Sequence, residues 1–300
     1  MRKLENIFER LLPVTETALK FSTDDNGNIP KVGKKPIFSD TKVITLSLAA
    51  EFLSIDSENR LFVFLNESAF FKSHNIIDRS CFNRRRKYLL PYYKTVLDYL
   101  SEVIAPHEDA FIIDSFPIQI CRFARAKRSI ICKENFDTAP DYGYCAAQKN
   151  TYFGYKLHAL CGISGVFKNF DLSKASIYDG LYLQDVKYNL SNCILLGDKA
   201  YIGKDIQLDL FNSSGIRLFT PKRKNQANFQ PYPPILRKLR KRIETIFSQL
   251  CDQFMIQRNY AKSFRGVAVR IISKIVAFTA AQYANKFFNN KSINNVKYAF

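Results

Sequence analysis

The stretch that decides the fold is FIIDSF at residues 111–116, in which an apolar run leads directly to Asp114. A run of this kind predicts a buried strand, and an ionised carboxylate at its end is costly to bury unless it is paired or binds a metal ion. The pattern returns in CILLGDKAY at residues 193–201, which leads to Asp198. A third carboxylate, Glu244, lies in RKRIETIFSQL at residues 240–250, where the apolar spacing is helical.

The three carboxylates and the overall charge together indicate a class of function. Two aspartates at strand ends and a glutamate on a later helix can form an all-oxygen site for a hard divalent cation. The chain has 300 residues and a net charge of +18, an excess that points to a polyanionic partner and says nothing about the fold. An acidic metal site within a basic chain predicts an enzyme that acts on nucleic acid.

The three segments resemble the catalytic core of bacterial insertion-sequence transposases of the Asp-Asp-Glu (DDE) type. The chain as a whole is most similar to the insertion-sequence-982 family, over roughly residues 38–284. Its second-aspartate motif matches Gly197-Asp198-Lys199-Ala200-Tyr201. Arg240 precedes Glu244 by four residues, as the family arginine precedes the third carboxylate.

The resemblance implies both the reaction and the metal. We expect Asp114, Asp198 and Glu244 to hold two Mg²⁺ or Mn²⁺ ions, with Asp114 shared between them. The reaction implied is hydrolysis at the element end, which releases a 3′-OH, followed by attack of that 3′-OH on target DNA. Because two ends must be brought together, a homodimer or larger assembly on DNA is expected.

The element pattern predicts a mixed α/β fold from about residue 105. Strands are expected at 111–121, 152–161, 166–172, 193–198 and 216–220, and helices at 179–189, at 204–214 and from 233 onward. The family resemblance supplies the topology, a ribonuclease H-like domain with a mixed five-stranded sheet flanked by helices. We expect this catalytic domain to span residues 105–258, followed by a C-terminal helical tail at 259–300.

Residues 1–104 are expected to form an all-α, helix-turn-helix-like domain that binds DNA. Helices are predicted at 4–21, from Asp40, at 59–71 and from a cap at Asp78 or Ser80. The last of these carries the run Arg84-Arg85-Arg86-Lys87, which we interpret as a DNA-contacting surface. A solvated charge run on a structural helix is the alternative.

Further cations extend the predicted DNA surface. The long connection 122–151 carries Arg122, Arg125, Lys127 and Arg128 among aromatic residues, a mixture that can hold a phosphate backbone and stack on bases. A plain surface loop is the alternative interpretation. Lys199, Lys222 and Arg223 continue the basic track.

The helix that carries Glu244 is expected to place Arg237 and Arg240 on the same face as the carboxylate. These arginines can contact phosphate, although an Arg240–Glu244 ion pair is the plainer interpretation. The chain departs from the family pattern here. Many related transposases have a tyrosine where this chain has Arg237, and a lysine where it has Cys251.

The composition argues against a zinc protein, a secreted protein and a membrane protein. Seven cysteines with irregular spacing and three histidines argue against a zinc site. The N-terminus lacks a signal-peptide pattern, and the apolar stretch 267–287 is interrupted by Arg270 and Lys274, which predicts an amphipathic helix and no membrane span. We therefore expect a bacterial cytoplasmic, nucleoid-associated protein with free thiols.

Two rival functions remain open. A ribonuclease H-like nuclease or junction resolvase would share the fold but would not need a module that selects a DNA end. A domesticated, non-catalytic DNA-binding protein would not need all of Asp114, Asp198 and Glu244.

Overall fold

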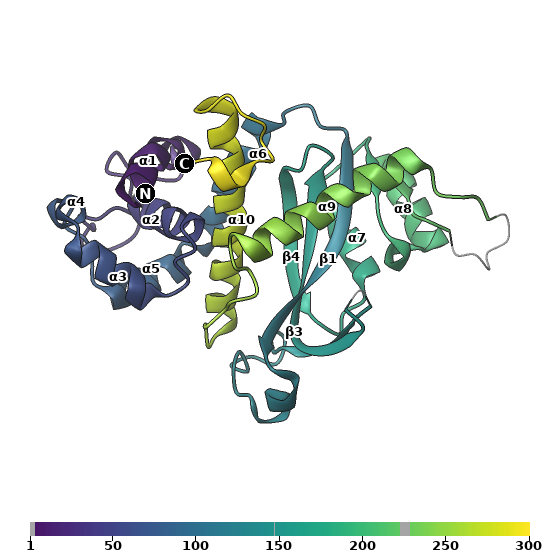
Figure 1. Ribbon diagram of the computed structural model, residues 1–300, viewed down its shortest axis with the longest axis horizontal. Coiled ribbons are helices and arrows are strands. Elements are labelled where there is room, and N and C mark those ends of the chain that lie inside the picture. The colour runs from purple at the N-terminus through teal and green to yellow at the C-terminus, as the bar shows by residue number, and fades with distance from the viewer. Residues whose placement is uncertain (1–3, 147, 223–228) are drawn as a thin grey trace. The chain divides into compact units, whose positions relative to one another are not determined.

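The computed structural model describes residues 4–146, 148–222 and 229–300. The chain forms two compact units, which we call the helical unit (Met1–Ile104 with Leu250–Phe300) and the sheet unit (Ala105–Gln249). Figure 1 shows the helices of the former and the sheet of the latter, with α9 lying over one face of the sheet.

The sheet unit has a mixed sheet, with six strands in the described part of the chain. The strands are β1 (Ala110–Cys121), β2 (Asp141–Cys145), β3 (Asn150–Gly162), β4 (Phe167–Lys174), β5 (Ile194–Leu196) and β6 (Arg217–Phe219). Its α-helices are α7 (Tyr182–Val186), α8 (Lys204–Ser214) and α9 (Pro234–Asp252), and its 3-10 helices are η1 (Phe123–Arg128), η2 (Asp179–Leu181) and η3 (Lys199–Tyr201). The mixed α/β class predicted from the sequence is confirmed.

Strand β1 lies at the centre of the sheet. It pairs antiparallel with β3 along nearly its whole length and parallel with β5, which in turn pairs parallel with β6. The other edge of β3 pairs first with β2 and then with β4. Because side chains alternate across a strand, Ile112, Asp114 and Phe116 share one face of β1, whereas Phe111 and Ile113 join the core on the other.

One strand was not predicted. The connection 122–151, expected to be a loop, contains η1 and the short strand β2. The sequence of β2, DYGYC, carries little apolar signal, and the strand is fixed by pairing with β3 and by close packing at Gly143. A Cβ at Gly143 would lie 2.7 Å from the Ala175 carbonyl oxygen, so the approach of these segments requires glycine.

The helical unit contains α1 (Leu4–Leu19), α2 (Asp40–Phe52), α3 (Glu58–Glu67), α4 (Ala69–Ser73), α5 (Arg79–Tyr88), α6 (Leu90–Ile104), α10 (Phe264–Phe287) and the 3-10 helix η4 (Val296–Tyr298). Helix α10 packs against α2, α5 and α6. Residues 259–300, expected to be a separate tail, therefore belong to the core of this unit.

Side-chain caps begin five helices of the helical unit, α2, α3, α4, α5 and α10. Asp78 accepts from the Cys81 N–H at 2.9 Å and begins α5, as predicted. Helix α2, however, is capped by Ser39, so Asp40 lies inside the helix. The single helix expected at 59–71 is divided, because Ser68 ends α3 and caps α4.

Helix α10 is buried on almost every side, so the prediction of an amphipathic helix is wrong. Lys274 is only 1% exposed, yet its Nζ lies 2.6 Å from Glu51 Oε2 and donates to the Phe254 carbonyl. Arg270 donates to the Asp56 carbonyl at 2.8 Å. These partners on distant segments allow two cations to be enclosed. Within the described ranges, none of the helices has the length and apolar character needed to span a membrane.

Glu51 is the centre of a buried ion network. It accepts from Arg86 at 2.5 Å as well as from Lys274. Burial alone would raise the pKa of Glu51, but Lys274 and Arg86 outweigh it and lower that pKa. The network joins α2, α5 and α10 through one carboxylate.

We expect Glu51→Gln to destabilise the helical unit by about 3–5 kcal/mol, because it removes the counter-charge of buried Lys274 and leaves Arg86 with the longer Glu58 pair at 3.7 Å. Urea unfolding followed by circular dichroism measures the change. The control is Asp98→Asn, which breaks the exposed Lys94–Asp98 pair and should change stability by less than about 1 kcal/mol. Equal effects of the two substitutions would contradict the central role of Glu51.

Candidate active site

The parallel pairing of β1 with β5 brings two aspartates to the same edge of the sheet. The last pair in the register is Ile112 with Leu196. Asp114 and Asp198 each follow two residues later, so both lie just beyond the point where the two strands separate. The placement predicted from the apolar runs is therefore produced by a specific register.

Local hydrogen bonds hold both aspartates. Asp198 is the N-cap of η3 and accepts from the Ala200 N–H at 2.7 Å. Asp114 accepts from the Ser115 N–H at 2.8 Å. Gly197 packs against Tyr201, whose ring atoms would lie 3.2–3.3 Å from any Cβ at that position.

Helix α9 places Glu244 on the face of β1 that carries Asp114. The Phe116 and Phe247 rings, whose centroids are 5.1 Å apart, join β1 to α9. Ile243 and Ile246 are buried, whereas the Glu244 side chain is 53% exposed. Its Oε1 lies 3.3 Å from Arg240 Nη2, so the predicted ion pair is present.

The negative charges of the three carboxylates exceed the positive charge near them. Burial raises the pKa of Asp114 to about 7, and the charges of Asp198 and Glu244 add to this, while the Ser115 N–H and Arg240 oppose it. Burial also raises the pKa of Asp198, again against Arg240. Carboxylates from three elements thus act on one another, and one arginine only partly neutralises them.

Asp114, Asp198 and Glu244 are hard oxygen donors, the ligand type that divalent cations such as Mg²⁺ prefer. No three His, Cys, Asp or Glu side chains among the described residues form a ligand group for one ion. Mg²⁺, however, is commonly held by one or two carboxylates, with water and substrate phosphate completing its shell. Asp114 and Asp198 are carboxylates of this kind, and their charges act on one another.

Two of the four DNA contacts predicted on α5 are buried in the structure. Arg85 is buried and bonds to Asp40 and to the Phe38 carbonyl, and Arg86 is 5% exposed and pairs with Glu51. Neither side chain can reach DNA, so both are withdrawn as DNA contacts. Arg84 is exposed and Lys87 partly exposed, so both remain predicted DNA contacts.

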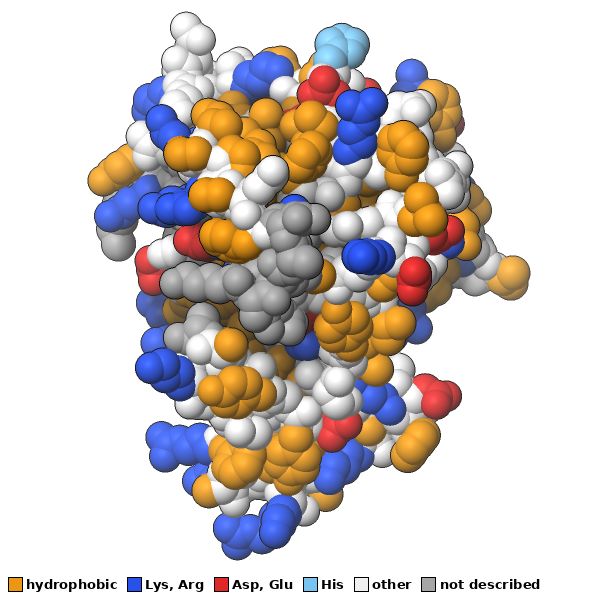
Figure 2. Space-filling view, turned by 90° about the vertical axis from the view of Figure 1, so that its right-hand side faces the viewer, with side chains coloured by type: hydrophobic (Ala, Val, Ile, Leu, Met, Phe, Trp, Pro, Cys, Tyr) orange, Lys and Arg blue, Asp and Glu red, His pale blue; other side chains and the backbone are white. Residues whose placement is uncertain are grey.

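The remaining predicted cations lie mostly on the surface. Exposed side chains include Arg122, Arg125, Lys127 and Arg128 on and beside η1, together with Lys199, Lys222 and Arg237. Arg223 lies outside the described residues. Figure 2 shows Lys and Arg side chains dispersed among hydrophobic ones over one face, with fewer acidic side chains.

Residues near the site were also missed. Asp179 raises the pKa of Asp198, and Lys156 pairs with Asp179 at 3.2 Å. Neither residue belongs to a local carboxylate pattern, and only the folded chain brings them to Asp198. His158 is buried, and its Nε2 lies 2.8 Å from Ser173 Oγ.

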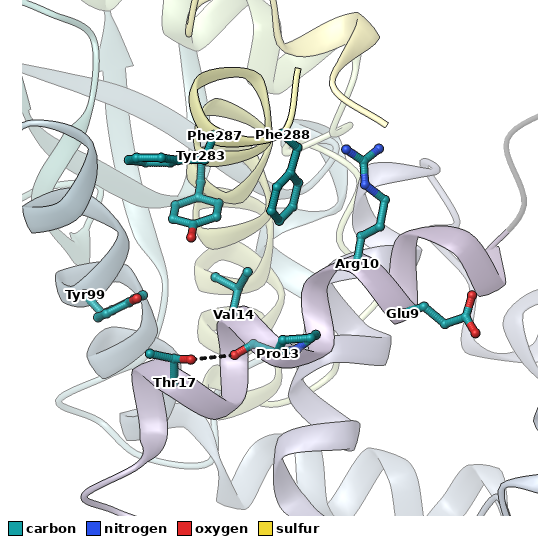
Figure 3. A pocket seen from close by; sticks show the side chains of 9 residues that line it. All are labelled: Glu9, Arg10, Pro13, Val14, Thr17, Tyr99, Tyr283, Phe287 and Phe288. Atoms are coloured by element: carbon teal, nitrogen blue, oxygen red, sulfur yellow. Dashed lines mark hydrogen bonds between the residues drawn. The ribbon is translucent and has the colours of Figure 1, made fainter. Parts of the chain in front are cut away.

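A pocket of about 610 Å³ lies in the helical unit between α1, α6 and α10. Figure 3 shows the rings of Tyr99, Tyr283, Phe287 and Phe288 around it, with Arg10 at one side. Glu9 is its one acidic residue. The pocket therefore lacks the paired carboxylates of the sheet unit and is no candidate for metal-dependent chemistry.

The comparison with known families agrees with the geometry. Residues 105–279, more than half of the chain, match the family model described as "Transposase DDE domain". The matched region includes all three carboxylates and continues into α10. No curated protein sequence matches the chain significantly.

We expect Asp114→Asn to stabilise the metal-free protein at pH 8 but not at pH 4. The pKa of Asp114 is raised on folding, so its contribution to stability is complete below pH 3.8, the ordinary value, and is lost as the pH rises through about 7. The substitution removes that loss, which is on the order of 2–4 kcal/mol. Unfolding of both proteins in chelator at each pH measures the difference. An equal difference at both pH values would contradict this ionisation.

Proposed function

Because this chain belongs to the DDE transposase family, we propose that it binds the ends of an insertion sequence, cleaves the DNA there and joins the 3′-OH ends to target DNA. The observation that carries the proposal is that Asp114 and Asp198 lie just beyond two adjacent parallel strands. Glu244, on α9, is near enough for its charge to raise the pKa of Asp114. The sheet order, with β1 between β3 and β5, supports a ribonuclease H-like domain. The second-aspartate motif supports placement in the insertion-sequence-982 family of bacteria.

In this proposal the three carboxylates bind metal ions and Arg240 binds phosphate. Asp114 would be shared between two divalent ions, Asp198 would complete the ligands of one and Glu244 those of the other. Such ions supply activation of the attacking oxygen and stabilisation of the leaving oxygen in phosphoryl transfer. Arg240 lies beside Glu244 and can bind a phosphate oxygen, so that negative charge entering the site is balanced.

The DNA would contact both units. In the helical unit, Arg84 and Lys87 are the accessible cations of the predicted run 84–87, and in the sheet unit the η1 arginines lie beside aromatic side chains. Phe123 is 50% exposed, and its ring centroid is 5.7 Å from that of Tyr142. Exposed rings among cations suit contacts with unpaired bases. Synapsis of two ends calls for a dimer or larger assembly.

A nuclease or resolvase is the second candidate, since the same carboxylates can hydrolyse DNA without joining it. A substrate built from the DNA flanking the coding region distinguishes the candidates. Cleavage at inverted repeats followed by joining supports transposition, cleavage without joining supports a nuclease, and binding alone supports a non-catalytic protein.

We expect Asp114→Asn, Asp198→Asn and Glu244→Gln each to abolish cleavage while leaving DNA binding largely intact. Each substitution removes a hard oxygen ligand but keeps the shape of the side chain. Cleavage is measured with Mg²⁺ or Mn²⁺ and with chelator, and binding by mobility shift. Near wild-type cleavage by any one variant would remove that residue from the ligand set.

We expect Arg84→Ala to weaken DNA binding and to reduce the salt dependence of the binding constant by up to about 0.9 in the log–log slope. The full chain is needed, because α10 completes the helical unit. Lys72→Ala, which removes an exposed cation from α4, is the charge-matched control. A slope unchanged by Arg84→Ala would place the contact elsewhere, with residues 122–128 as the next region to test.

We expect Arg240→Ala to slow strand transfer about ten-fold or more, which corresponds to about 1.4 kcal/mol of transition-state stabilisation. Arg237→Ala should have a smaller effect, since Arg237 lies one turn farther from Glu244. Cys251→Ser should be nearly neutral, because burial raises the pKa of this thiol and keeps it uncharged. Single-turnover joining of pre-cleaved ends measures all three. A severe defect in Cys251→Ser beside an active Arg240→Ala would contradict this assignment.

A further inference from the structure

A polar cluster, formed by Lys156, His158 and Asp179, lies in the sheet unit beside Asp198. Lys156 and His158 are two residues apart on β3 and so share one face of the strand. Asp179 begins η2, and its Oδ1 lies 3.2 Å from Lys156 Nζ and 3.8 Å from His158 Nδ1. Both β3 side chains thus converge on one carboxylate oxygen.

Further contacts fix the side chains of Lys156 and His158. Lys156 Nζ donates to the Ile177 carbonyl at 2.7 Å, which ties it to the segment entering η2. His158 Nε2 lies 2.8 Å from Ser173 Oγ, and the imidazole ring stacks on Tyr182 with centroids 5.1 Å apart. These contacts leave little freedom for Asp179.

A hydrogen bond connects this segment to the turn that carries Asp198. The Tyr178 hydroxyl donates to the Ala200 carbonyl at 2.5 Å, and the Ala200 N–H donates to Asp198 at 2.7 Å. Ala200 is therefore held on one side by the residue before Asp179 and on the other by Asp198. Asp179 is also close enough to Asp198 to raise its pKa.

Stability alone does not account for the cluster. His158 Nδ1 and the hydroxyls of Tyr182 and Tyr201 are buried without a hydrogen bond, whereas Asp179 Oδ1 is ion-paired with Lys156. Tyr201 is 1% exposed, and burial together with Asp114, Asp179 and Asp198 raises the pKa of its hydroxyl. Buried polar atoms without partners oppose folding. Three of them lie in or beside this cluster, near the proposed metal ligands, which indicates a role beyond stability.

We propose that Asp179, held by its ion pair with Lys156, is a positioning residue for Asp198 and thereby sets the affinity of the site for its divalent cation. The inference rests on the proposed function. Asp179 fixes the 178–181 segment, that segment fixes the η3 turn through Ala200, and the turn orients the Asp198 carboxylate. Groups that orient metal-binding carboxylates in this way commonly change metal affinity by about 10–100-fold when they are removed.

The test compares Asp179→Asn with a matched control in the same unit. Lys187 Nζ and Asp209 Oδ2 form another Lys–Asp pair at 3.2 Å, and neither residue belongs to the proposed site. Mn²⁺ is titrated into the full-length protein, and free Mn²⁺ is followed by electron paramagnetic resonance. Asp179→Asn should raise the dissociation constant about ten-fold or more, whereas Asp209→Asn should change it by less than about two-fold.

Two further measurements separate positioning from folding. Thermal unfolding in chelator should show that both Asp179→Asn and Asp209→Asn remain folded at the temperature of the Mn²⁺ titration. Lys156→Arg, which keeps the cation, should bind Mn²⁺ nearly as wild type does, whereas Lys156→Met should resemble Asp179→Asn. Wild-type Mn²⁺ affinity in Asp179→Asn, or a loss explained by unfolded protein, would overturn the inference.

An assay of cleavage of the flanking DNA distinguishes failure of the proposed function from failure of the positioning role of Asp179. A wild-type protein that binds Mn²⁺ but cleaves no DNA would contradict the proposed function and leave the positioning role standing. A wild-type protein that cleaves, with an Asp179→Asn variant equal to it at limiting Mn²⁺, would contradict only the positioning role. Absence of Mn²⁺ binding in the wild type would overturn both.

Discussion

The parallel pairing of β1 with β5 is the constraint on which the candidate site depends. Its last register pair, Ile112 with Leu196, sets the point at which the two strands separate and their aspartates come together. A shift of one residue would move Asp114 to the opposite face of the sheet, away from α9. The buried runs that fix this register are therefore as necessary to the chemistry as the carboxylates themselves.

The two units treat buried charge in opposite ways. In the helical unit, Glu51 has two close cationic partners and Asp40 accepts two hydrogen bonds from Arg85, so these carboxylates are neutralised. In the sheet unit, Asp114 and Asp198 repel one another, and Arg240 is shared with Glu244. Charge paired in this way holds helices together, whereas unpaired negative charge is suited to bind cations.

Helix α9 joins the sheet to the candidate site. Its buried residues anchor it to β1 through Phe116 and Phe247, and its exposed turn carries Arg240 and Glu244. Because Glu244 remains half in solvent, it is the least constrained of the three carboxylates. Asp198, by contrast, is fixed by its own turn and by the segment around Asp179.

The sequence by itself determined the features that depend on neighbouring residues. Apolar runs ending in Asp114 and Asp198, the Asp78 cap and the end of α8 at Gly215, whose φ is 66°, could all be predicted, because each is set within a few residues. Only the tertiary structure decided that Arg85 and Arg86 are buried, since their partners come from other segments of the chain. It also decided the pairing of β2 and the placement of Asp179 beside Asp198. These features depend on contacts between segments far apart in the chain, and local patterns carry no information about such contacts.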